Sequence, residues 1–248
     1  MNNETKQISK KSVSAKQVLK SAFNGIMEDP LLYMCLVIPI YLFTGISVIF
    51  SDFIIINNLD YDYYRYSDEK YFIGIGFVFL ESYVFSLIAV AIHNNIIKER
   101  LVFSFFSKGI IIYFFFYIAT YLDFILHFIE HVIPLGVAVF LILFVYVFYI
   151  VMALTAWLWI LYLPNISTKD KHSFFYIVKN SYGARLTIIV QAIYITLIFG
   201  LMFALFSYIG GENIGLIFTL PIMILFCIIT LSHTYLGWKK LEAETNKL

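Results

Sequence analysis

Four residues in the apolar stretch near position 125 have side chains and spacing that suit chemistry. His127, Glu130 and His131 lie four, seven and eight residues after Asp123, which places all four on one face of a helix. Zinc accepts both carboxylate and imidazole ligands. The alternative is a hydrogen-bonded pair of Asp123 and His127 that joins two helices, with a hydrated outer end. We favour the pair, because polar residues inside membranes are often packing partners.

Glu81 is a further ionisable residue inside an apolar segment. It lies about ten residues into the run from about Tyr71 to Ile92, near the middle of a membrane helix. A charge there is costly and marks a candidate for function. Glu81 would either bind a proton or cation between helices, or pin helix packing against Gln191 or a tyrosine, and we favour packing. Together, Glu81, Asp123 and His127 form the candidate intramembrane polar site.

The sequence carries no signature of an enzyme. It has no Gly-x-Ser-x-Gly, no His-Glu-x-x-His and no phosphate-binding glycine loop. Cys35 and Cys227 stand alone in apolar runs and suggest neither a disulfide framework nor a metal motif. We therefore expect a protein that is not an enzyme and has no cofactor. The alternative is a membrane-embedded, metal-dependent enzyme. Its metal site would depend wholly on the outer part of the helix face that starts at Asp123.

The elements that position these residues are membrane helices. Of the 248 residues 61% are apolar and only 13% are charged, whereas soluble domains carry about a quarter charged residues. The net charge of +1 gives no electrostatic reason to expect a nucleic-acid partner. Partners should instead be membrane lipids or another membrane protein.

Six apolar stretches are long enough to cross the bilayer, which takes about 20 residues of helix. They are Leu31–Phe50 and, approximately, Tyr71–Ile92, Gly109–Glu130, Val132–Leu163, Leu186–Tyr208 and Ile214–Leu236. We expect an all-α polytopic membrane protein of three helical hairpins. Its parts are an N-terminal segment (1–30), a six-helix domain (31–238) and a tail (239–248).

The basic residues predict the orientation. Fifteen Lys and Arg residues lie in the two termini and in the connections after the second and fourth spans, whereas only Arg65 and Lys70 lie in the other connections. Cytoplasmic loops are enriched in Lys and Arg. Both termini should therefore be cytoplasmic.

A basic, amphipathic segment precedes each hairpin on the cytoplasmic side. In the first, apolar residues between Val18 and Met27 share one half of a helix, and lysines occupy the other. The second is 100–108 and the third is 172–183. Interfacial helices of this kind attract anionic lipid headgroups. The candidate headgroup contacts are Lys16, Lys20, Lys108 and Lys179.

Two stretches of the chain resemble known bacterial membrane proteins. The stretches are Pro30-Leu-Leu-Tyr, and Leu161-Tyr-Leu-Pro164-Asn-Ile followed by Lys169-Asp170 and Phe175 to Ser181. They look like the YciC-type inner-membrane family and the membrane domain attached to some glycerophosphoryl diester phosphodiesterases. The resemblance implies a six-helix fold in the bacterial inner membrane, with an amphipathic helix after the proline. It carries over no catalytic residue.

We therefore expect a non-enzymatic inner-membrane protein that organises lipid or partner proteins in the envelope. The alternative function is a small transporter or channel that uses Glu81 and Asp123.

Overall fold

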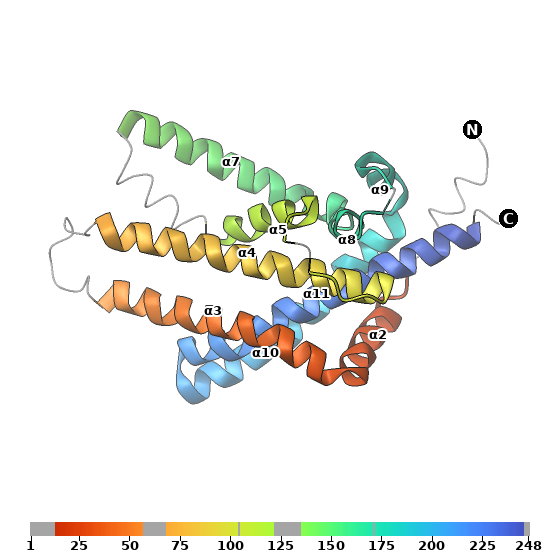
Figure 1. Ribbon diagram of the computed structural model, residues 1–248, viewed down its shortest axis with the longest axis horizontal. Helices are drawn as coiled ribbons and strands as arrows, with labels where there is room; N and C mark the ends of the chain where they lie inside the picture. The colour runs from red at the N-terminus through yellow and green to blue at the C-terminus, as the bar shows by residue number, and fades with distance from the viewer. Residues whose placement is uncertain (1–12, 57–67, 104, 122–134, 171, 246–248) are drawn as a thin grey trace.

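The computed structural model describes residues 13–56, 68–103, 105–121, 135–170 and 172–245, and every regular element in them is helical (Figure 1). The all-α prediction is therefore confirmed. The elements are α2 (Ala15–Glu28), α3 (Pro30–Ile56), α4 (Asp68–Lys98), α5 (Lys108–Ile118), the 3₁₀ helix η1 (Ala119–Tyr121), α7 (Leu135–Trp159), α8 (Tyr162–Ser167), α9 (Phe174–Asn180), α10 (Tyr182–Gly210) and α11 (Glu212–Thr245).

Three described helices are long and apolar enough to cross a membrane. They are Ile73–Lys98 within α4, α10, and Glu212–Glu244 within α11. A fourth candidate is the bent pair of α2 with residues 30–46 of α3. These helices mark the chain as a multi-pass membrane protein, whereas the six spans that the sequence predicts remain a prediction.

Polar side chains cap the N-termini of several helices. Ser14, Ser107 and Ser173 each accept a hydrogen bond from the backbone N–H three residues later, at the starts of α2, α5 and α9. Asp29 does the same for Leu32 in α3. These side chains satisfy backbone donors that a helix leaves unpaired in its first turn.

Helix α2 lies across the bundle and does not continue α3. The two helices meet at 96°. Val18 and Ala22 are buried where α2 packs against α10 and α11, but Phe23 and Met27, which belong to the same apolar half, are exposed. One part of the apolar half of α2 therefore packs against α10 and α11, and the other part is exposed.

The long helices form a bundle in which α10 and α11 are the closest pair, joined at the single residue Gly211. The last predicted hairpin is therefore present. In contrast, α4 packs mainly against α5 and α11 and only slightly against α3. The short helices α2, α8 and α9, and the end of α11, lie at one end of the bundle (Figure 1), which we call the α9 end.

Two local predictions differ from the structure. The apolar run from Val132 to Leu163 is not one helix, because α7 ends at Trp159 and α8 starts at Tyr162, with Leu161 and Leu163 buried in the core. The described residues between Arg100 and Ser107 form no helix, and Lys108 already belongs to α5. This stretch folds back along α4, where the hydroxyl of Tyr83 donates to the carbonyl of Phe105 at 2.8 Å.

Candidate functional site

Glu81 is one of the residues that line a cavity inside the bundle. Glu81 is only 1% exposed, and the cavity has a volume of about 650 Å³. Its wall comes from α3, α4, α5, η1, α10 and α11 and from the junction of α7 with α8. The structure thus places the sequence-predicted Glu81 beside an interior space.

Gln191, which the sequence analysis names as a packing partner for Glu81, lines the same cavity. Its Oε1 atom lies 3.0 Å from the hydroxyl of Thr234. Its Nε2 atom is buried and has no hydrogen-bond partner among the described residues, and the same holds for the hydroxyl of Thr44 elsewhere on the wall. Buried polar atoms without partners are uncommon in folded proteins.

His93 connects the cavity wall to the core. Its Nδ1 atom lies 2.6 Å from the hydroxyl of Ser232, and its Nε2 atom bonds the hydroxyl of Tyr113, which lines the cavity. Ser232 also lies 2.8 Å from the carbonyl of Ile228, which can only accept. The serine proton therefore goes to Ile228, Nδ1 of His93 donates to Ser232, and Tyr113 donates to Nε2.

The remaining residues of the predicted intramembrane stripe are not part of the described structure. Asp123, His127, Glu130 and His131 all fall within 122–134, outside the described residues. The metal site and the Asp123 to His127 pair therefore both remain hypotheses.

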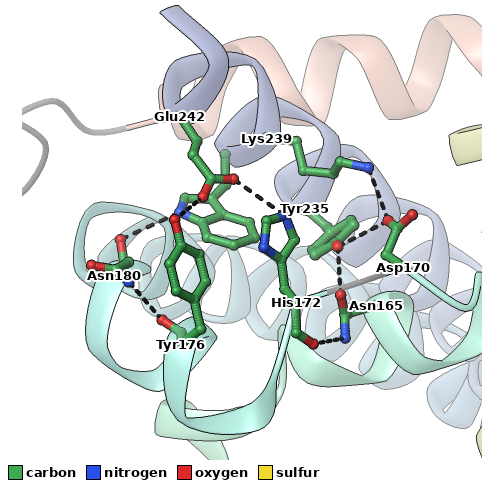
Figure 2. Close-up of polar contacts among 9 residues, drawn as sticks. Asn165, Asp170, His172, Tyr176, Asn180, Tyr235, Lys239 and Glu242 are labelled. Carbon is green, nitrogen blue, oxygen red and sulfur yellow. Dashed lines mark hydrogen bonds and ion pairs between the residues drawn. The ribbon is translucent and has the colours of Figure 1, made fainter. Parts of the chain in front are cut away.

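A second cluster of polar side chains lies at the α9 end, where α11 meets the segment from α8 to α9 (Figure 2). Oδ2 of Asp170 accepts hydrogen bonds from Nζ of Lys239 at 2.9 Å and from the hydroxyl of Tyr235 at 3.0 Å. Tyr235 is fully buried, and its hydroxyl also lies 2.9 Å from Oδ1 of Asn165. The amide of Asn165 in turn donates to the carbonyl of His172 at 2.9 Å.

Glu242 forms the other half of this cluster. One carboxylate oxygen accepts from the hydroxyl of Tyr176, and the other lies 3.4 Å from Nε2 of His172. The ring of His172 stacks on Tyr176 and meets the edge of Trp238. We call the whole cluster the polar network. It comprises Asn165, Asp170, His172, Tyr176, Tyr235, Trp238, Lys239 and Glu242.

Two groups of the polar network have shifted pKa values. Burial alone would raise the pKa of Asp170, but the hydrogen bonds from Lys239 and Tyr235 and the charge of Lys239 outweigh it and lower the pKa. Burial, together with the hydrogen bond and charge of Glu242, raises the pKa of Tyr176 to about 12. Asp170 is therefore ionised and Tyr176 is a neutral donor at neutral pH.

The four lysines that the sequence predicts as headgroup contacts are all exposed. Large apolar side chains lie near them in sequence and are exposed too: Phe23 (58%), Phe106 (93%) and Phe175 (81%). Lys16 and Lys20 belong to α2 and Lys179 to α9, both at the α9 end. Lys108 starts α5 next to α8, where Gly109 closely approaches Ser167.

Sequence reasoning missed the polar network, although one signal was available. Tyr235, Trp238, Lys239 and Glu242 are spaced as i, i+3, i+4 and i+7, which predicts a polar and aromatic stripe on the last helix. Nothing comparable marks their partners, because Asp170 and His172 lie in an irregular connection.

Comparison of the chain with protein-family models, with curated proteins and with solved structures gave no match.

Proposed function

We propose that this protein is a non-enzymatic membrane protein that organises anionic lipid at the α9 end of its bundle. The observation that carries the proposal is the pairing of exposed lysines with exposed aromatic side chains in α2, α9 and the start of α5. Aromatic rings favour the level of the headgroups, and lysine side chains reach anionic phosphates from there. Each such lysine contributes about 1 kcal/mol of attraction to an anionic membrane surface.

The lysine distribution also supports an orientation. If the α9 end faces the cytoplasm, the surface lysines meet the leaflet in which anionic lipids attract basic segments. In the same orientation, the termini and connections that carry fifteen Lys and Arg residues lie in the cytoplasm, and the connections that carry only two lie on the other side. The cytoplasmic placement of both termini and the bacterial inner membrane as location belong to this proposal.

The test is to replace Lys16, Lys20, Lys108 and Lys179 together by Gln, with the same four replaced by Arg as the matched control. Protein purified in nanodiscs of mixed phosphatidylglycerol and phosphatidylcholine would be released into detergent, and the retained lipid counted by native mass spectrometry. The Gln variant should lose its preference for phosphatidylglycerol and the Arg variant should keep it. An unchanged preference in the Gln variant would refute the proposal.

A small transporter or channel is the second candidate function. The cavity lined by Glu81 and Gln191 favours it, because transport requires an interior polar site between helices. Replacement of Glu81 should then abolish a flux across vesicles that contain the protein. Asp123, the other residue expected to take part, lies outside the described residues.

A further inference from the structure

The cavity inside the bundle is long and narrow. Residues of α11 line it from Leu216 to Leu231, and the helix between them spans about 22 Å at about 1.5 Å per residue. A volume of about 650 Å³ over that length gives a mean cross-section of about 30 Å². A helix about 10 Å wide has a cross-section of about 80 Å². The cavity is therefore too narrow for a helix of a partner protein, but it is wide enough for a single hydrocarbon chain.

Most of the surface that faces the cavity is hydrocarbon, because its lining residues are mainly aliphatic or aromatic. Their polar groups offer the cavity little accessible surface. Glu81 is 1% exposed, the unpaired atoms of Gln191 and Thr44 are buried, and the hydroxyl of Tyr113 bonds the ring of His93. A polar ligand would lose its hydration there and gain few hydrogen bonds in return. The wall therefore suits an apolar occupant.

The cavity reaches the outer face of α10 at Ala192. This residue lines both the cavity and a smaller hollow on α10, whose other wall residues are Ile189, Ile193, Thr196 and Leu197. All five of these side chains are exposed. Because α10 is long and apolar enough to cross a membrane, its exposed face lies against the hydrocarbon of the bilayer. The molecules that meet the cavity at Ala192 are therefore the acyl chains of membrane lipids.

We infer that the cavity is a binding site for one acyl chain of a membrane phospholipid. The chain enters beside Ala192 and extends along α11, where it contacts Leu220 and Met223, and the headgroup stays at the membrane surface. Along the cavity wall the chain makes the many weak dispersion contacts that stabilise an apolar interior. The inference goes beyond the proposed function, because it assigns a site for a hydrocarbon chain inside the bundle and requires no particular headgroup.

The test uses phosphatidylcholine that carries a photoreactive diazirine in one acyl chain. The protein is reconstituted with this lipid in nanodiscs of unlabelled phosphatidylcholine, and the crosslinked positions are mapped by tandem mass spectrometry after irradiation. Leu220 and Met223 line the cavity, whereas Phe218 and Ile222 are exposed on the opposite side of the same helix. Both pairs should be labelled in the wild type, the first from within the bundle and the second from the surrounding bilayer.

The variant Ala192→Trp should close the entry to the cavity. Its indole ring occupies the space beside α10 through which the chain passes, so labelling of the two cavity positions should fall at least about fivefold. Labelling of the two exposed positions on α11 should not change. The matched control is Ala204→Trp, because Ala204 is exposed on the same helix and lines neither the cavity nor the smaller hollow. This control should be labelled like the wild type.

Wild-type protein that is labelled at the exposed positions but not at the cavity positions would overturn the inference, and this outcome needs no variant. Undiminished labelling of the cavity positions in Ala192→Trp protein would overturn it as well. The same diazirine chain supplied as a free fatty acid tests the other source of a chain, and labelling of the cavity by the fatty acid alone would exclude phospholipid. Phosphatidylcholine carries no net charge, so this site and the proposal for the surface lysines fail separately.

Discussion

The hydroxyl of Tyr235 is the most informative single group to remove. It is buried between Oδ2 of Asp170, at 3.0 Å, and Oδ1 of Asn165, at 2.9 Å. A phenol carries one proton and donates to one acceptor at a time, so Tyr235→Phe removes one hydrogen bond. The ring, which packs against Trp238, stays in place.

The expected cost is about 2 kcal/mol, because hydrogen bonds to charged groups contribute about 1.5 to 3 kcal/mol and Asp170 keeps its bond from Lys239. The matched control is Tyr208→Phe, since Tyr208 is 91% exposed and should lose almost nothing. Unfolding by increasing mole fractions of dodecyl sulfate in mixed micelles, followed by far-UV circular dichroism, would measure both changes.

A double-mutant cycle with Asp170→Asn separates the partners of Tyr235. If the hydroxyl donates mainly to the carboxylate, the two changes should be non-additive by about 1 kcal/mol. Additive losses would show that Asn165 is the main acceptor. A loss for Tyr235→Phe no larger than that for Tyr208→Phe would refute the stabilising role of the polar network.

Two further predictions concern packing and pH. A Cβ atom at Gly109 would lie 2.9 Å from the Cα atom of Ser167, so Gly109→Ala should destabilise the protein by about 1 to 3 kcal/mol in the same unfolding assay. Gly45→Ala is its control, because no described atom beyond its own turn of helix lies within 4 Å of that Cβ, and it should be neutral or stabilising. The pKa of Asp170 is lowered below its ordinary value of 3.8, so its contribution to stability is present above that pH and is lost as the pH falls through the lowered value. The destabilisation by Asp170→Asn, measured from pH 7 downward, should therefore be full at neutral pH and shrink in acid; a penalty that does not change with pH would contradict the assignment.

The sequence predicted the helices well where a local signal exists. The separation of apolar and basic residues in 16–27 onto two halves of a helix predicted α2. The short connection between the fifth and sixth apolar stretches likewise predicted the hairpin of α10 and α11. These features depend on residues close in sequence, which is why pattern alone found them.

The parts of the fold and of the candidate site that the sequence did not predict depend on contacts between distant segments. In α7, α10 and α11 nearly every position is apolar, so hydropathy cannot separate a face that touches lipid from a face that lines a core or cavity. For that reason the break at Ile160 between α7 and α8 was invisible in the sequence. The residues that line the cavity with Glu81 come from six other segments of the described chain and could be named only in part from the sequence.

Helix α11 joins the cavity to the polar network through two adjacent residues. The hydroxyl of Thr234 lies 3.0 Å from the amide oxygen of Gln191, which is one of the residues that line the cavity. The next residue, Tyr235, bonds the connection that holds Asp170. Because a helix fixes the angle between consecutive side chains, a rotation of α11 that breaks the contact of Tyr235 also moves Thr234 away from Gln191. The polar network at the α9 end and part of the cavity wall are therefore carried by one helix, α11, although the two sites share no side chain.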